Sequence, residues 1–361
     1  MSDFRVPDTT ARFDRSVPDI HEPYRAQADR YTHLAYRRVG RSGLFLPPIS
    51  LGLWYNFGDN RPFQIQRDIL RHAFDRGIIH FDLADNYGPP NGSAEENFGR
   101  VLRKDLRPYR SELVISTKAG WPHWPGPHGD FGSRTHLLSG LDESLERLQT
   151  DYVDIFYSHR VDPVTPIEET VGALDAAVRQ GKARYVGLSS YSAERTRQAL
   201  EVARSLGTPL VIHQPAYSLV NRWAERELFG LLAKEGLGSI AFTPLAQGLL
   251  TDRFLRDPNA SHATPRPSFD PRTVSEDNLA RLRGLDAIAR RRGQSLAQLA
   301  IAWVLRPGGA TSALVGVSSI AQLDENLAAL DAAPFSDDEL AEIDGFAGDA
   351  GVNLWAVSSE L

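Results

Sequence analysis

The sequence predicts an α/β protein folded as a closed (β/α)8 TIM barrel, with an N-terminal β-hairpin and extra C-terminal helices. Three observations predict this fold. Eight short apolar runs alternate with segments of helical spacing, most connections between them are short, and several successive runs end in polar residues. Alternation of this kind is typical of parallel strands joined by crossover helices.

The expected elements follow one another in a regular order. A small hairpin comes first, with strands at residues 36–39 and 44–46 around the turn Gly40-Arg41-Ser42-Gly43. The eight barrel strands are expected at residues 49–52, 78–82, 113–118, 152–157, 183–189, 209–214, 237–243 and 312–317. Apolar residues with helical spacing predict helices at residues 64–76, 94–103, 135–148, 167–180, 193–205, 222–235, 276–292, 296–305 and 321–330.

The chain is predicted to hold one folded unit. Residues 1–33 are polar and interrupted by prolines, which indicates a mobile N-terminal arm, and residues 34–361 form the single barrel. The alternative is a doubly wound open sheet, which the sequence favours less because no Gly-x-Gly-x-x-Gly and no P-loop pattern follows a strand. Residues 119–133 and 246–273 make unusually long connections, so both are candidate lids or binding loops.

Composition limits the classes of function. Apolar residues make up 42% and charged residues 24%, which is ordinary for a globular protein. A net charge of −6 gives no reason to expect nucleic acid as a partner. The chain has no cysteine, which excludes disulfides, thiol nucleophiles and thiolate metal sites. No apolar run is long enough to span a membrane and the amino terminus is polar, so a cytoplasmic location is expected.

Four polar residues are predicted to meet at the carboxyl rim of the barrel, where active sites of this fold lie. Asp82 ends the second strand, and Tyr87 follows it closely. Lys118 ends the third strand, and His159 follows the fourth. A lysine ammonium lowers the pKa of a neighbouring tyrosine, and a carboxylate keeps the lysine charged. The four together predict proton donation by Tyr87 to a carbonyl oxygen that His159 orients.

Taken singly, each of these residues has an ordinary explanation as a helix cap, a rim aromatic, a solvated strand end or a packed histidine. Their convergence from three neighbouring strands favours a shared site. Uncharged polar residues end other strands and suit an amide such as a nicotinamide carboxamide, although they can equally be buried caps: Ser189, Ser190, Gln214 and Thr243. Ser318 and Ser319 precede the last helix and can hold a phosphate at its positive end. His123 and His128 lie in a loop rich in Pro and Gly and are best explained as packed or solvent-facing, so no metal site is expected.

The chain resembles the aldo-keto reductases through long motifs. Two of them are Phe81-Asp82-Leu83-Ala84-Asp85-Asn86-Tyr87-Gly88-Pro89-Pro90 and Phe242-Thr243-Pro244-Leu245-Ala246-Gln247-Gly248-Leu249-Leu250-Thr251. Shorter ones are Ser116-Thr117-Lys118-Ala119-Gly120, Ser158-His159-Arg160, Gly187-Leu188-Ser189-Ser190-Tyr191 and His213-Gln214-Pro215. The resemblance runs from about residue 36 to residue 359 and is nearest to the branch of bacterial L-glyceraldehyde-3-phosphate reductases, relatives of the potassium channel β subunits.

This resemblance implies a barrel that binds NADPH in extended form and reduces small aldehydes, such as glyceraldehyde 3-phosphate or methylglyoxal. It implies that Tyr87 is the general acid, with Lys118 and Asp82 as its tuning pair and His159 as the orienting group. It implies cofactor contacts at Trp54, Ser189, Ser190, Gln214, Thr243, Pro244, Leu245, Gln247, Gly248, Leu249, Arg253, Gly316, Ser318, Ser319, Gln322, Glu325 and Asn326. The substrate pocket would hold Trp54, Tyr87, His159 and Arg160, and a homo-oligomer is expected from this branch.

The sequence departs from the family pattern at three positions of the expected cofactor site. Ser319 and His262 stand where relatives often carry an arginine, and Ser190 stands where many carry asparagine. Losing two guanidinium groups weakens recognition of the 2′-phosphate that distinguishes NADPH from NADH. We therefore expect use of NADH as well, with Arg253 or Arg266 compensating in part.

Two other functions remain open from sequence. A cofactor-binding regulatory subunit, like the potassium channel relatives, would keep the barrel and turn over slowly. A cofactor-free aldolase or isomerase would use Lys118 as a Schiff base, but would leave Tyr87 and His159 without a role.

Overall fold

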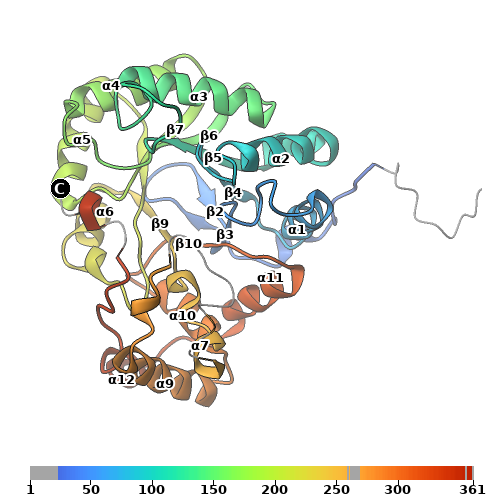
Figure 1. Ribbon diagram of the computed structural model, residues 1–361, viewed down its shortest axis with the longest axis vertical. Helices are drawn as coiled ribbons and strands as arrows, with labels where there is room; N and C mark the ends of the chain where they lie inside the picture. The colour runs from blue at the N-terminus through green and yellow to red at the C-terminus, as the bar shows by residue number, and fades with distance from the viewer. Residues whose placement is uncertain (1–22, 258–259, 261–268, 354–355, 360–361) are drawn as a thin grey trace, which may run out of the picture.

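The computed structural model describes residues 23–257, 260, 269–353 and 356–359. At its centre eight parallel strands close into a barrel, in the order β10-β3-β4-β5-β6-β7-β8-β9 (Figure 1). The strands are β3 (Ile49–Gly52), β4 (His80–Asp82), β5 (Val114–Ala119), β6 (Val153–Ser158), β7 (Ala183–Ser189), β8 (Leu210–Gln214), β9 (Gly238–Phe242) and β10 (Ser312–Val315). Because β10 pairs with both β3 and β9, the predicted TIM barrel is confirmed and the open sheet is excluded.

Most of the helices lie around the strands, and some of those near the C-terminus pack on other helices instead (Figure 1). They are α1 (Phe63–Asp75), α2 (Ser93–Val101), α3 (Arg134–Leu148), α4 (Ile167–Arg179), α5 (Ala193–Leu206), α6 (Leu228–Glu235), α7 (Arg253–Arg256), α9 (Glu276–Arg291), α10 (Leu296–Val304), α11 (Ile320–Leu327), α12 (Asp337–Asp344) and α13 (Ala356–Ser359). None of the helices in the described ranges is long and apolar enough to cross a membrane.

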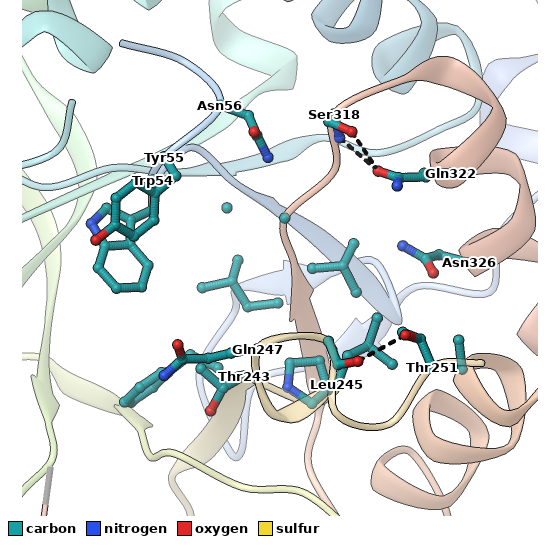
Figure 2. Close-up of a pocket in the computed structure, with 18 of the residues that line it drawn as sticks. Trp54, Tyr55, Asn56, Thr243, Leu245, Gln247, Thr251, Ser318, Gln322 and Asn326 are labelled. Atoms are coloured by element: carbon teal, nitrogen blue, oxygen red, sulfur yellow. Dashed lines mark hydrogen bonds between the residues drawn. The ribbon is translucent and has the colours of Figure 1, made fainter. Parts of the chain in front are cut away.

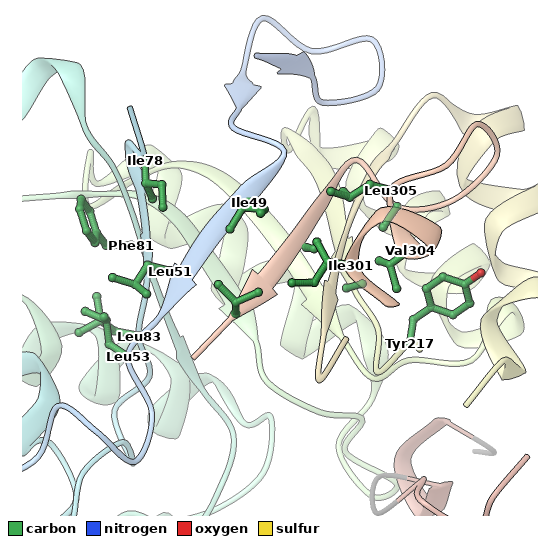
Figure 3. Close-up of a cluster of buried hydrophobic side chains, with 14 of the residues drawn as sticks. Ile49, Leu51, Leu53, Ile78, Phe81, Leu83, Tyr217, Ile301, Val304 and Leu305 are labelled. Atoms are coloured by element: carbon green, nitrogen blue, oxygen red, sulfur yellow. The ribbon is translucent and has the colours of Figure 1, made fainter. Parts of the chain in front are cut away.

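Burial on both faces explains why the barrel strands have few exposed positions. All six residues of β5 and all six of β6 are buried, as expected for parallel strands covered by helices. The outer layer of the core packs strand residues such as Leu51 and Phe81 in the same cluster as Ile301 and Val304 of α10 (Figure 3). This layer holds the strand ends in register, which fixes the rim on which the polar residues stand.

The predicted hairpin is confirmed and closes the amino end of the barrel. Its strands are β1 (Arg37–Arg38) and β2 (Phe45–Leu46). Val39, Leu44 and Leu46 are buried in one cluster with interior residues of the barrel strands such as Ile155 and Ile240. The apolar plug fills this end, so the polar residues at the carboxyl ends of the strands face the opposite opening.

Several elements differ from their predicted extent. The helix expected at residues 222–235 is a 3-10 turn (Trp223–Glu225) followed by α6, because Glu227 has φ −139° and ψ −36°, outside the helical region. The helix expected at 94–103 ends at Val101 and continues as a π-helix (Leu102–Leu106). The last expected helix ends earlier, at Leu327, before a 3-10 turn.

Helix α12 is one of the extra C-terminal helices of the predicted fold class, but no residue range was predicted for it, although the sequence carries its start signal. The Ser336 hydroxyl accepts the backbone N–H of Glu339, and the Glu339 side chain accepts the backbone N–H of Ser336. This reciprocal arrangement is a capping box, which marks a helix start. Helix α7 lies within the long connection after β9 and was also missed.

Part of the predicted arm is attached to the barrel. The Tyr24 hydroxyl donates to Asp75 at the end of α1, at 2.6 Å, and the backbone N–H of Ala26 donates to the Tyr109 hydroxyl at 3.0 Å. Arg30 is buried and bonded to Glu112. The description of a mobile arm therefore does not fit residues 24–33, whereas residues 1–22 lie outside the described part of the chain.

Candidate active site

Neighbouring strands bring the four predicted catalytic residues to one rim. Asp82 is the last residue of β4 and is aligned with Ser116 of β5, while Lys118 is aligned with Tyr157 of β6. Parallel strands in register end at the same edge, so side chains at successive ends converge. Tyr87 lies in the loop after β4, within hydrogen-bond distance of Lys118.

Lys118 is fully buried and its ammonium group donates to three oxygen atoms. The Nζ atom lies 2.6 Å from Asp82 Oδ2, 2.6 Å from the Leu83 carbonyl oxygen and 3.2 Å from the Tyr87 hydroxyl. Asp82 is also fully buried. Three donors and three acceptors match, so the charge of Lys118 is held in one place beside the phenol.

Burial has the largest single effect on the pKa values of Tyr87 and Lys118. It raises the pKa of Tyr87 above its ordinary value, and the opposing effect of Lys118 is smaller. The predicted lowering effect of the lysine is therefore present, but it does not bring the net pKa of Tyr87 below the usual value. Burial acts to lower the pKa of Lys118, but Asp82 and Tyr87 outweigh burial and raise it. At neutral pH Tyr87 therefore carries its proton and Lys118 carries its charge.

His159 completes the group on the side of the long connection at residues 119–133. Its ring lies 5.8 Å from the Tyr87 ring and 6.2 Å from the Trp121 ring, measured between centroids. Burial, followed by the positive charges of Lys118 and Arg160, holds the pKa of His159 well below its usual value. The ring is therefore neutral and carries one N–H, which is the form that can donate a hydrogen bond without protonating a substrate.

A cavity of about 460 Å³ opens beside these residues. Figure 2 shows Trp54 and Tyr55 on one side of it, Ser318, Gln322 and Asn326 on another, and the segment after β9 along the bottom. The residues that line it are Gly52, Trp54, Tyr55, Asn56, Asp82, Tyr87, Phe242, Thr243, Pro244, Leu245, Gln247, Gly248, Thr251, Asp252, Arg253, Ser295, Ala297, Leu314, Val315, Gly316, Ser318, Gln322, Glu325 and Asn326. Of the four predicted catalytic residues, Asp82 and Tyr87 line the cavity and Lys118 and His159 do not. The cavity therefore joins Tyr87 to the amino end of α11.

Most of the predicted cofactor residues lie in this lining, and five do not: Ser189, Ser190, Gln214, Leu249 and Ser319. Leu249 is fully buried in the core. Ser319 caps α11, because its hydroxyl accepts the backbone N–H of Gln322. Ser189 donates to the Gln214 carbonyl oxygen, and the Gln214 amide donates to Asp82. His262 and Arg266 lie outside the described residues.

Sequence reasoning missed several lining residues. Tyr55 and Asn56 follow the end of β3 by three and four residues, so the rule that placed Asp82 at the rim could have found them too. Thr251 and Asp252 lie in the loop after β9. Ser295 precedes α10, and no local signal in the sequence ties it to this rim.

Arg160 follows His159 in the sequence and contacts the Trp121 ring. Its guanidinium lies between two aromatic rings, 4.1 Å from the centroid of Trp121 and 4.3 Å from that of Phe131. It donates to the Gly120 carbonyl oxygen and forms an ion pair with Asp130. The structure therefore places this predicted substrate residue behind Trp121 rather than in the cavity lining.

The cavity suits an extended dinucleotide. Thr243, Ala246 and Gln247 have φ of 53°, 45° and 56°, which bends the segment after β9 along the cavity in a conformation that side chains rarely adopt. Arg253 contributes a positive charge to the lining, which suits a pyrophosphate, and Tyr87 contributes a hydroxyl to the same lining. The residues present fit a nicotinamide dinucleotide.

Comparison with known proteins agrees with this geometry. The aldo/keto reductase family model matches residues 48–347, so the chain belongs to that family. Members of this family use nicotinamide cofactors, and the protein is an NAD(P)H-dependent oxidoreductase. L-glyceraldehyde 3-phosphate reductase of Escherichia coli K12 is 53% identical over 341 residues, which cover 93% of this chain and 99% of that protein.

More distant relatives carry a different name. The probable voltage-gated potassium channel subunits beta of rice (Oryza sativa subsp. japonica) and of Arabidopsis thaliana are 37% and 36% identical. The first match covers 86% of this chain and 95% of the rice protein, and the second covers 83% and 92%.

Proposed function

We propose that the protein reduces small aldehydes to alcohols with Tyr87 as the general acid, and that glyceraldehyde 3-phosphate and methylglyoxal are among its substrates. The observation that carries this proposal is the position of Lys118 Nζ, 2.6 Å from Asp82 and 3.2 Å from the Tyr87 hydroxyl, beside the cavity. The similarity to the E. coli reductase supports the choice of glyceraldehyde 3-phosphate as the first substrate to assay.

NADPH, when bound, would supply a hydride to the carbonyl carbon. Tyr87 donates its proton to the carbonyl oxygen as negative charge develops there. The positive charge of Lys118 stabilises the phenolate that results, and Asp82 keeps Lys118 charged and in place. The neutral ring of His159 donates its N–H to the carbonyl oxygen and orients it.

The test is steady-state oxidation of NADPH with both aldehydes. Tyr87→Phe removes only the hydroxyl and should lower kcat by roughly 10²- to 10⁴-fold, the usual contribution of a positioned acid, with NADPH affinity close to that of the wild type. Tyr185→Phe makes the same chemical change near the hairpin, where Tyr185 packs on the amino-end cluster, and should keep activity. Near-normal turnover of Tyr87→Phe would remove Tyr87 as the acid.

The plant relatives favour a second candidate, a cofactor-binding regulatory subunit with slow turnover. The same assay separates the two. A kcat below about 0.01 s⁻¹ for every aldehyde in a panel, far under the usual enzyme range, together with tight NADPH binding, would favour the regulatory role.

For the cofactor we propose NADPH with appreciable use of NADH. Ser319, where relatives often carry arginine, is occupied by capping α11, and a serine lacks the bidentate geometry of a guanidinium. The measurement is kcat/KM for each cofactor. A preference for NADPH above roughly a thousandfold, about 4 kcal/mol, would contradict the proposal.

Arg160 is our proposed partner for an anionic substrate group, in exchange for part of its contact with Asp130. Arg160→Met should then raise KM for glyceraldehyde 3-phosphate much more than KM for uncharged methylglyoxal. Equal changes for the two aldehydes would show that Arg160 only supports Trp121. The cytoplasmic location and the homo-oligomer remain predictions, and light scattering after gel filtration checks the latter.

A further inference from the structure

A hydrogen-bonded chain runs across the barrel interior to the back of the tetrad. Ser312 Oγ of β10 lies 2.8 Å from Ser50 Oγ of β3, which lies 2.9 Å from His80 Nδ1 of β4. His80 Nε2 lies 3.0 Å from Ser116 Oγ of β5, which donates to Asp82 Oδ1 at 2.6 Å. All five residues have no exposed surface.

The direction of each hydrogen bond in this chain follows from Asp82, the acceptor at its end. A carboxylate only accepts, so the single proton of the Ser116 hydroxyl points to Asp82. The Ser116 oxygen must then accept from His80, which places the imidazole proton on Nε2. Nδ1 is left to accept from the Ser50 hydroxyl. Burial lowers the pKa of His80 to about 4, in keeping with a neutral ring that carries this one proton.

This chain does not deliver protons to the site. Its far end is the buried Ser312 hydroxyl, whose single proton is used in the bond to Ser50. The chain therefore meets no titratable group on the far side of His80 and no solvent among the described residues. A proton lost by Tyr87 must return from the cavity side. What the chain can do is hold each acceptor in one orientation.

We propose that His80 is a positioning residue for proton donation by Tyr87. Its Nε2–H fixes the Ser116 hydroxyl, the hydroxyl fixes one oxygen of Asp82, and the other oxygen of Asp82 holds Lys118 beside the phenol. The Gln214 amide also donates to Asp82 Oδ1, the oxygen that Ser116 holds, at 3.1 Å, but it lies outside the chain. This inference rests on the proposed function.

Substitutions at His80 separate hydrogen bonding from packing. His80→Leu fills similar space without either ring nitrogen and should lower kcat roughly tenfold, the scale of one lost hydrogen bond behind a charged group. KM and NADPH affinity should stay within about twofold on the same scale. His80→Gln provides an amide N–H for Ser116 and should recover most of kcat.

His213→Leu is the matched control. His213 is another fully buried, neutral histidine of a barrel strand, and burial lowers its pKa to about 3. It bonds the Tyr191 carbonyl oxygen and has no contact with Asp82. This variant should lose stability as His80→Leu does, yet keep kcat.

The decisive experiment is a double-mutant cycle with Asp82→Asn. If His80 acts through Asp82, adding His80→Leu to Asp82→Asn should change the residual kcat by less than about twofold. A full tenfold loss in that background, or unchanged kcat in His80→Leu alone, would overturn the proposal. Should His80→Leu fail to fold, Ser116→Ala breaks the same chain and enters the same cycle. Wild-type turnover tests the proposed function separately, since every effect here is measured relative to it.

Discussion

The buried ion pair of Lys118 and Asp82 allows a quantitative prediction about stability. Both side chains have no exposed surface, and their charged atoms lie 2.6 Å apart. Lys118→Met removes the cation and leaves a carboxylate in the interior with two remaining donors, Ser116 and Gln214. Removing one member of such a pair typically costs about 3–5 kcal/mol, so the free energy of unfolding should fall by about that amount.

The double variant Asp82→Asn/Lys118→Met is the informative comparison. It leaves no uncompensated charge, so it should lose less stability than Lys118→Met alone, although neither variant should retain reductase activity. Urea unfolding followed by the fluorescence of the six tryptophans measures both values. An exposed pair gives the control: Arg290→Met breaks the contact with Asp286 and should cost less than about 1 kcal/mol. If the double variant loses the sum of the two single losses, the charges are not coupled and the reasoning is refuted.

Three further predictions concern pH and packing. The pKa of His159 lies well below 6.5 and that of Tyr87 lies above 10.0, so kcat for reduction should not change between pH 6.5 and pH 10.0. A loss of kcat centred well below pH 10.0 would contradict the raised pKa of Tyr87. His80 has a folded-state pKa of about 4 against an ordinary 6.5, so on acidification the unfolded chain binds the proton first. The stability that His80 contributes above pH 6.5 should be lost towards pH 4, by roughly 3 kcal/mol. His80→Gln should reduce the slope of that part of the curve of unfolding free energy against pH, to which His159 and His213 also contribute. Gly99→Ala places a methyl group 2.2 Å from the Arg147 carbonyl oxygen where α2 meets α3, so it should lower the unfolding free energy by about 1–3 kcal/mol. A melting temperature equal to that of the wild type would show that α2 and α3 can move apart without cost.

The sequence was sufficient for the barrel and for the meeting of the tetrad because both follow from local patterns and from one geometric rule. Alternating apolar runs and helical segments give parallel strands, and parallel strands end on a common rim. Asp82, Lys118 and His159 each stand at or just beyond a strand end, so their proximity was predictable. The start of helix α12 could also have been predicted, since its capping box is a local sequence pattern.

Some features depended on contacts that no local pattern contains. Ser295 and Tyr55 come from segments 240 residues apart, and only closure of the barrel brings both to the cavity. The contacts of Tyr24 and Ala26 with Asp75 and Tyr109 attach a polar segment that looked like part of a free arm. Arg160 is paired with Asp130 across a loop, which its position after His159 did not reveal.

By itself, then, the sequence determined the fold class and the residue types that meet at the rim, because side-chain spacing along strands and helices decides which face is buried. Only the tertiary structure decided the protonation of those residues. Desolvation depends on the surface that distant elements cover, and it sets the pKa of Tyr87 above its usual value despite the neighbouring lysine. The interior chain from Ser312 to Asp82 is likewise assembled from four strands, and it exists only once the barrel has closed.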